Sequence, residues 1–276
     1  MKRKIRTNLS ILILGIFSFF YLASCSNNAS NESHDCDSSH VQADSTHAGQ
    51  EHAAWDYEGD NGPAHWATIE GCGDCDNTMQ SPIDITGAVV SKELAALKLT
   101  YKAVTSIEIL NNGHTVQINY PAGSILTFNG KDYELKQFHF HAPSEHTVNG
   151  TPYPAEVHLV HKTPDGAISV IGILIKEGAE NAFIKSFIAA IPKEADKTVK
   201  FDVNIDINQI LPKSKAYYNY SGSLTTPPCT EAVNWIVMKE VIEINKVQLT
   251  TLEEAMPDNN ARPVQPLNNR VIQVFE

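Results

Sequence analysis

The sequence is short of basic residues. Its 276 residues include 21 lysines and arginines against 32 aspartates and glutamates, which gives a formal net charge of −11 at pH 7. Four of the basic residues lie within the first six positions, so the rest of the chain is even more acidic. Such a chain repels nucleic acid and anionic lipid surfaces. We therefore expect no nucleic-acid partner, and a substrate that is small and neutral or is handled by a local positive charge such as a metal ion.

The sequence also lacks an apolar run typical of a membrane span. The run at 9–23 follows a basic start and is shorter than the roughly 20 apolar residues of a spanning helix. This pattern predicts a signal peptide over residues 1–24, with an uncleaved anchor helix as the alternative. The segment ends Leu22-Ala23-Ser24-Cys25, which resembles a bacterial lipobox. We therefore expect Cys25 to carry a lipid in a bacterial cell envelope, with the body in the periplasm or at the cell surface.

Large apolar residues are nearly missing from 26–52, which is rich in Ser, Asn, Asp and His and cannot bury a core. Residues 25–54 are therefore predicted to be a flexible polar tether. Its histidines could scavenge metal, although a solvated tether is favoured; they are His34, His40, His47 and His52. There is no internal repeat and no second linker, so residues 55–276 are expected to form one domain.

Cysteine is scarce as well, with five in the chain. Assigning Cys25 to lipid leaves an even four, Cys36, Cys72, Cys75 and Cys229, as two disulfides in an oxidising compartment would require. Cys72 and Cys75 form a Cys-x-x-Cys motif, but no second such motif exists and no strand–helix context surrounds it. A redox motif or half of a structural zinc site is therefore disfavoured.

What the body does contain is strand patterns separated by turns. Asn129-Gly130 and Asp165-Gly166 lie between such runs and indicate hairpins. Helical periodicity is confined to 180–191 and 251–256. The pattern predicts a predominantly β (α+β) fold with one large, mostly antiparallel sheet and short surface helices. The expected strands are 106–112, 114–120, 124–128, 132–141, 155–163, 168–176, 217–222 and 233–240.

One of these strands can hold a metal. Side chains alternate between the two faces of a strand, so His139 and His141 share one face while Phe138 and Phe140 face a core. The pair alone is weak evidence, but His158 on the next predicted strand can supply a third nitrogen. Three histidines leave the fourth position of a tetrahedral zinc ion open for water, as in catalytic rather than structural zinc sites.

Two further residues fit such a site. Gln137 precedes His139 by two residues, and Glu156 stands in the same relation to His158, so each shares a face with its histidine. Metal-bound histidines usually donate their other N–H to an oxygen that fixes the ring. Gln137 and Glu156 are predicted to provide those oxygens.

At this point the chain resembles a family. The segments QFHFH, SEHTV, AEVHLVH, LNNGH, QSPIDI and SLTTPPC, together with WDYEGDNGPAHW and RPVQPLNNR, are similar to the motifs of alpha-class carbonic anhydrases, in the family's order. The match runs from Trp55 to about Arg270. The resemblance implies a zinc lyase that hydrates carbon dioxide reversibly to bicarbonate and a proton through attack of zinc hydroxide. Membrane association would come only from the lipid.

The resemblance also assigns roles. His139, His141 and His158 would bind Zn²⁺. Thr225 would accept the proton of the hydroxide and donate its own proton to Glu145. The Thr225 backbone N–H would bind a substrate oxygen, and Thr226 would belong to the same substrate site. The apolar pocket for carbon dioxide would be formed by Val160, Val170, Leu224, Val233 and Trp235.

Proton transfer is assigned in the same way. His114 would be the proton shuttle, and Tyr57, Asn112 and Gln117 would organise water; the best-known family members differ at the Gln117 position. Exported members often join the positions of Cys75 and Cys229 in a disulfide that clamps the Thr225 loop. Cys72 could then pair with Cys36, while a Cys72–Cys229 bond remains an alternative. Two further histidines of these motifs, His146 and His161, are expected to be hydrogen-bonded core residues.

Three rival functions remain. A non-catalytic binding module on the same fold would have lost a zinc histidine, and all three are present. A cupin-like metal barrel also uses His-x-His but gives no reason for TTPPC or SEHTV. An envelope zinc buffer would depend on the histidines of 26–52.

Overall fold

The structure, a computed structural model, describes residues 55–276. The expected signal peptide, the lipidated Cys25 and the tether with its four histidines lie outside these residues. Within residues 55–276 there is no helix with the length and apolar character needed to cross a membrane.

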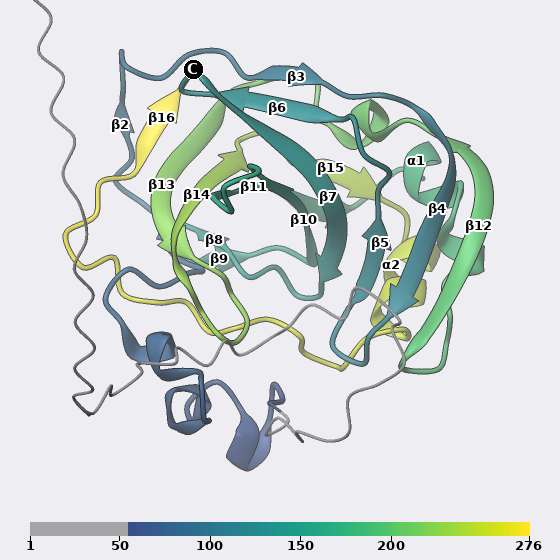
Figure 1. The fold of residues 1–276 in the computed structure, drawn as a ribbon, viewed down its shortest axis with the longest axis horizontal. Helices are drawn as coiled ribbons and strands as arrows, with labels where there is room; N and C mark the ends of the chain where they lie inside the picture. The colour runs from purple at the N-terminus through teal and green to yellow at the C-terminus, as the bar shows by residue number, and fades with distance from the viewer. Residues whose placement is uncertain (1–54) are drawn as a thin grey trace, which may run out of the picture. The chain divides into compact units, whose positions relative to one another are not determined.

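A sheet of 13 strands dominates this region (Figure 1). It is mostly antiparallel, as expected, and becomes mixed where β14 and β15 pair with β11 and where β2 pairs with β16. The main path runs in the order β12 (Lys197–Ile205), β4 (Val104–Asn111), β5 (Val116–Asn119), β7 (Lys131–His141), β10 (Ala155–Lys162), β11 (Ile168–Glu177), β14 (Glu231–Met238), β13 (Tyr217–Ser223), β16 (Gln273–Phe275) and β2 (Val89–Val90).

The remaining strands are short. Beside the main path, β15 (Ile242–Ile244) pairs with β11, and β6 (Ile125–Phe128) pairs with both β3 (Lys98–Thr100) and β7. A separate three-stranded sheet contains β1 (Asp84–Ile85), β8 (Thr147–Val148) and β9 (Thr151–Pro152). All of the predicted strand segments are strands. The edge strand β12 was not among them, although Val199, Phe201, Val203 and Ile205 alternate with polar residues along it.

Helices are few and short, as predicted. They are α1 (Ala182–Lys185), α2 (Lys246–Glu253) and the 3₁₀ turns η1 (Gly59–Asn61), η2 (Trp66–Thr68), η3 (Gly73–Asp76), η4 (Ile188–Ala190) and η5 (Ile207–Ile210). The helix expected over 180–191 divides into α1 and η4 after Ser186, whose hydroxyl donates to the Phe183 carbonyl. The helix expected over 251–256 begins earlier, because Asn245 and Gln248 form a capping box that starts α2.

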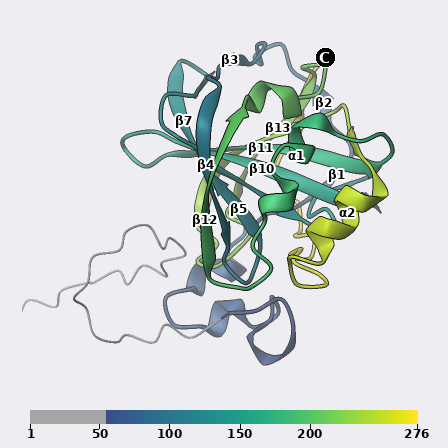
Figure 2. The ribbon, with the colours of Figure 1, turned by 90° about the vertical axis from the view of Figure 1, so that its right-hand side faces the viewer.

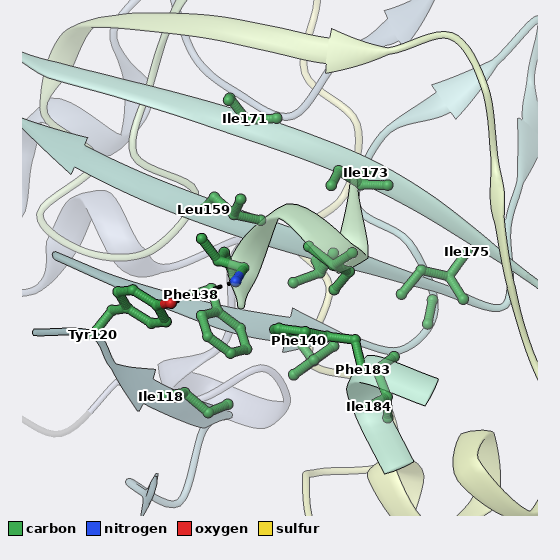
Figure 3. Close-up of a cluster of buried hydrophobic side chains, with 14 of the residues drawn as sticks. Ile118, Tyr120, Phe138, Phe140, Leu159, Ile171, Ile173, Ile175, Phe183 and Ile184 are labelled. Atoms are coloured by element: carbon green, nitrogen blue, oxygen red, sulfur yellow. Dashed lines mark hydrogen bonds between the residues drawn. The ribbon is translucent and has the colours of Figure 1, made fainter. Parts of the chain in front are cut away.

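The two faces of the sheet carry separate apolar clusters. Phe138 and Phe140 of β7 are fully buried in the larger one, where Phe183 of α1 lies 5.7 Å from Phe138 between ring centroids (Figure 3). Burying each phenylalanine stabilises the fold by about 1.5–3 kcal/mol. This packing holds β7 so that the side chains between the phenylalanines point to the opposite face.

The predicted turn at Asn129-Gly130 is a tight hairpin turn. Phe128 of β6 pairs with Lys131 of β7, so Asn129 and Gly130 form a two-residue loop, with φ of 48° and 76°. This left-handed pair is the conformation that Asn-Gly adopts most readily in hairpins.

The region from Trp55 to Asn77 has no strand. It is built from η1, η2 and η3 and from a small cluster in which Tyr57, Trp66 and three cysteines are buried. Figure 2 shows this segment, in dark blue, beside one end of the sheet strands.

Candidate metal centre

Two adjacent strands bring three histidines together. In the antiparallel pair of β7 and β10, His158 lies directly opposite His139, and Glu156 lies opposite His141. The ring centroids are 5.1 Å apart for His139 and His141, 5.2 Å for His139 and His158, and 4.6 Å for His141 and His158. One nitrogen from each ring lies within 4.8 Å of the others. A group of this size and composition can hold one metal ion.

Each ring has a second nitrogen close to an oxygen. His139 Nδ1 lies 2.8 Å from Gln137 Oε1, and His158 Nε2 lies 3.0 Å from Glu156 Oε1. These are the two pairs that strand alternation predicts. The third ring, His141, places Nδ1 2.7 Å from the backbone carbonyl of Asn260. Asn260 was missed by the sequence analysis, because a backbone carbonyl supplied from a distant segment leaves no side-chain pattern.

In each ring, the nitrogen that is not near one of these oxygens is suited to bind a metal. His141 Nε2 is buried and has no hydrogen-bond partner among the described residues, and such an orphaned nitrogen is costly unless it binds a ligand. Burial lowers the pKa of all three rings, to about 4 for His141 and well below 6.5 for His139. The rings are therefore neutral at pH 7 and keep the lone pair that coordination requires. An all-imidazole donor set fits Zn²⁺.

Glu156 organises the buried side of the site. Its Oε2 accepts the backbone N–H groups of Glu145 at 3.0 Å and His146 at 2.9 Å, and its Oε1 lies 2.8 Å from His146 Nδ1. Burial alone raises its pKa, but attraction to His146 and His158 and hydrogen bonds from both rings hold the pKa well below 4.5. Glu156 therefore stays a carboxylate that orients His158.

Glu145 lies against the same rings, on the turn after β7, and is 1% exposed. Its Oε1 accepts the backbone N–H of Arg262 at 2.9 Å, and its Oε2 lies 3.5 Å from His141 Nε2 and 3.8 Å from His158 Nδ1. Burial raises the pKa of Glu145 to about 7, while His158, the Thr225 hydroxyl and the Arg262 N–H oppose the rise. A buried carboxyl with one oxygen committed and the other facing the rings can accept one further proton donor.

Thr225 lies 6% exposed in the loop that joins β13 to β14. That loop is joined to η3 by a disulfide between Cys75 and Cys229, whose Cα atoms are 4.9 Å apart. This predicted bond is confirmed, and the alternative Cys72–Cys229 bond is wrong. The Cys36–Cys72 pairing involves Cys36, which lies outside the described residues.

The apolar residues that were assigned to a pocket do lie together. Val160, Val170, Val233 and Trp235 are buried in the second apolar cluster, and Leu224 packs against it. Trp235 also approaches the metal site, with 4.8 Å between its ring centroid and that of His158, and its indole N–H donates to the Ser223 carbonyl at 2.9 Å. The cluster therefore makes one wall beside the rings apolar.

His114 lies in the turn between β4 and β5. The side-chain oxygen of Asn112 accepts its backbone N–H at 3.0 Å and that of Thr115 at 2.8 Å, so Asn112 holds this turn. The imidazole stacks on Trp55 with ring centroids 3.8 Å apart and planes 12° from parallel. Burial lowers the pKa of His114, against the attraction of Asp56 and Asp196.

The other predicted water-organising residues lie on both sides of this turn. The Tyr57 ring is buried 6.3 Å from that of His114. Gln117 lies opposite His139 in the pairing of β5 and β7, and its amide donates to Asn119 Oδ1 at 2.7 Å. Gln117 thus lies next to a ring of the metal site.

The two remaining histidines of these strands and turns are buried and hydrogen-bonded, as expected. His146 Nε2 lies 2.7 Å from the Tyr220 hydroxyl, and His161 Nε2 lies 2.7 Å from the Tyr101 hydroxyl. His146, Glu156 and His158 are also close enough to form a metal group. Since both His146 nitrogens already have partners, the triad of His139, His141 and His158 is the better site.

Comparisons with known proteins agree with this geometry. The profile of the family described as eukaryotic-type carbonic anhydrase matches residues 61–276. A carbonic anhydrase of Klebsiella pneumoniae is 43% identical over 222 residues, which covers 79% of this chain and 89% of that protein. A carbonic anhydrase of Neisseria gonorrhoeae is 42% identical over 226 residues, covering 80% and 88%. The solved structure of an alpha-carbonic anhydrase from Thermovibrio ammonificans with the inhibitor sulfanilamide matches with a TM-score of 0.77 and 42% identity, over 80% of this chain and 99% of that one.

Proposed function

The chain belongs to the eukaryotic-type, or alpha-class, carbonic anhydrase family, and on this premise we propose that a zinc ion held by His139, His141 and His158 serves its reaction. The protein is an enzyme that hydrates carbon dioxide reversibly to bicarbonate and a proton. The observation that carries the zinc assignment is the convergence of three neutral imidazoles, each with its second nitrogen within 3.0 Å of an oxygen. A zinc ion in such a site lowers the pKa of water toward neutrality and so supplies a nucleophile, an effect for which carbonic anhydrase is the standard example.

Thr225 and Glu145 orient the nucleophile. The Thr225 hydroxyl has one proton to donate and accepts through its lone pairs. Donating that proton to Glu145 Oε2 leaves the hydroxyl oxygen able only to accept from the nucleophile. One lone pair of the nucleophile is then aimed at the substrate carbon, which reduces the orientational cost of the attack.

Carbon dioxide binds beside the rings against the apolar wall of Val160, Val170, Leu224, Val233 and Trp235. A small apolar substrate gains from burial there, while water loses hydrogen bonds. The backbone N–H of Thr225 binds a substrate oxygen, and Thr226 completes that side of the site.

His114 carries the released proton to solvent. Because its pKa lies below 6.5, the ring is neutral at pH 7 and can accept a proton. The Asn112 turn and the Trp55 ring hold the imidazole, and Tyr57 and Gln117 would organise the water that connects it to the metal site.

The N-terminal segment attaches the enzyme to a membrane. We propose cleavage after residue 24, lipidation of Cys25, and a tether over 25–54 that lets the catalytic domain work in the periplasm or at the cell surface. The basic start, the short apolar run and the lipobox-like end support this. In cells, C25S should move the protein from the membrane to the soluble fraction and abolish labelling by a radioactive fatty acid. Unchanged fractionation and labelling would contradict the anchor.

The zinc assignment is tested on the purified enzyme. Chelator-treated protein is titrated with Zn²⁺ while bound zinc and the stopped-flow rate of carbon dioxide hydration are measured. We expect both to rise together and to stop at one zinc per chain. Full hydration by metal-free protein would overturn the assignment. The same titration on protein lacking residues 26–52 tests the rival function as a zinc buffer. If that segment stored zinc, the full-length protein would bind more than one zinc per chain, and the deletion would remove the excess and leave hydration unchanged.

A further inference from the structure

The position of the Glu145 carboxylate is determined by a segment far away in the chain. Glu145 lies on a turn, and its Oε1 accepts the backbone N–H of Arg262, 117 residues later, at 2.9 Å. This bond leaves Oε2 as the oxygen that faces the rings of His141 and His158. The location of the Arg262 backbone therefore decides which carboxylate oxygen Thr225 can reach.

Arg262 is in turn held by its own side chain, which is 3% exposed. Nη1 donates to Gln80 Oε1 at 2.8 Å and to the Ser81 carbonyl at 2.9 Å, while Nη2 donates to the Cys75 carbonyl at 2.8 Å. The guanidinium carbon lies 5.5 Å from the centroid of the Trp66 ring. These contacts use the rigid, planar fork of an arginine, which the single nitrogen of a lysine cannot reproduce.

Gln80 extends the connection to the Thr225 loop. Its side chain is 2% exposed, and its Nε2 donates to the Cys229 carbonyl at 3.2 Å and to Glu231 Oε1 at 3.3 Å. The backbone N–H of Cys229 donates to the Thr226 carbonyl at 2.8 Å. Arg262 and the Thr225 loop thus share one buried amide, in addition to the Cys75–Cys229 disulfide.

The charges are consistent with this arrangement. All three acceptors around the guanidinium are neutral oxygens, and a buried cation among neutral groups is costly without a nearby anion. Glu145 is the carboxylate whose charge acts on Arg262. The guanidinium and the carboxylate belong to one buried unit even though they do not touch.

We propose that Arg262, acting through Gln80, is a positioning residue that holds the Glu145 carboxylate and the Thr225 hydroxyl at hydrogen-bonding distance from each other. The Glu145 turn and the Thr225 loop do not pair in the sheet, and the Arg262–Gln80 pair contacts both of them. The inference rests on the roles proposed above for Glu145 and Thr225. It assigns no contact with substrate to Arg262.

The first test is R262K, which keeps the charge and removes the fork. We expect zinc binding at one per chain to persist, because none of the three rings contacts Arg262. We expect kcat/KM for carbon dioxide hydration, measured per zinc-loaded molecule, to fall about tenfold, the effect of losing one charge-assisted hydrogen bond.

The decisive measurement is a double-mutant cycle with T225A. If Arg262 acts through the Glu145–Thr225 bond, R262K should lower kcat/KM by less than about twofold once Thr225 is gone, since interacting residues are not additive. A tenfold further loss in the T225A background would overturn the inference and leave the proposed function standing. An unchanged rate in T225A alone would overturn the role of Thr225 and this inference with it.

Two more variants distinguish the proposed positioning role from a general effect of misfolding. Q80A removes the link without touching Arg262 and should lower kcat/KM about threefold, again only when Thr225 is present. R270K is the matched control, because Arg270 also donates to backbone carbonyls, those of Pro266, Leu267 and Ser221. We expect R270K to lower the melting temperature with kcat/KM unchanged. A loss in R270K equal to that in R262K would mean general loosening of the C-terminal segment and would overturn the proposal.

Discussion

The residues of the site that lie on strands and those that lie on turns and loops are held in place by different contacts. His139, His141 and His158 lie on paired central strands, where backbone ladders and the core behind them determine where each ring points. Glu145 and Thr225 lie on a turn and a loop that are held by hydrogen bonds between side chains and backbone groups far away in the chain, whereas the His114 turn is held by Asn112, two residues away. The metal site should therefore survive loss of the loop contacts, whereas the orienting and proton-transfer groups should fail one at a time.

The largest effect on activity is expected when one of the three histidines on the strands is replaced. H139A removes one of three ligands, so zinc content should fall below one tenth per chain and hydration should fall more than about 1000-fold. Zinc analysis and stopped-flow hydration on the same sample check this. H161A is the control, because it removes another buried imidazole of the same strands that faces Tyr101 instead. Hydration that persists without zinc would show that the proposed zinc mechanism is wrong.

The next effect separates orientation from metal binding. T225A should keep one zinc per chain and lower kcat/KM about 100-fold, because an interaction that orients the nucleophile acts mainly in the transition state. T225S keeps the hydroxyl and should recover most of the rate. Equal losses in both variants would show that loop packing, and not the hydroxyl, is responsible.

A smaller effect is expected at His114. H114A should lower kcat about tenfold in weak buffer and leave kcat/KM unchanged, because proton release follows the hydration step. Small imidazole buffers should restore the rate, and H65A, an exposed histidine of the N-terminal segment, should have no effect. A fall in kcat/KM would place His114 in substrate binding instead.

The sign of the pH dependence follows from the environment of His114. Burial lowers its pKa below 6.5, and only the neutral ring accepts a proton. The His114 contribution to kcat should therefore be complete at pH 7 and should disappear as the pH falls through that lowered pKa. The difference between wild type and H114A, measured from pH 5 to 8, checks this. A contribution that grows on acidification would contradict it.

The smallest effect on the rate is expected from the disulfide. Cys75 and Cys229 are separated by 154 residues, and closing such a loop stabilises the fold by up to about 5 kcal/mol. Replacing both cysteines with alanine should lower the melting temperature by about 10 °C and change kcat/KM less than about threefold at 25 °C, because the Gln80 and Arg262 hydrogen bonds remain. A rate loss as large as that expected for R262K would show that the disulfide, and not the Gln80 and Arg262 hydrogen bonds, mainly holds the Thr225 loop.

Much of this protein could be predicted because strand alternation is local. The expected strands and the oxygen partners of His139 and His158 follow from the alternation of side chains along a strand, whereas the disulfide was implied by the family resemblance alone. The boundaries of α1 and α2 were displaced because Ser186 and the Asn245 cap act at single positions that periodicity does not report. Gln80 and Arg262 stood in the quoted QSPIDI and RPVQPLNNR segments, but nothing in either segment tells what its side chain contacts.

The sequence by itself determined which faces of β7 and β10 carry imidazoles and which carry core, because a strand turns each successive side chain to the other side. Only the tertiary structure decided that the Asn260 carbonyl holds His141 and that the Arg262 N–H holds Glu145. Every residue except proline has the same backbone donor and acceptor. Which of these groups reaches the site depends on how distant segments pack, and the identity of the residues does not encode it.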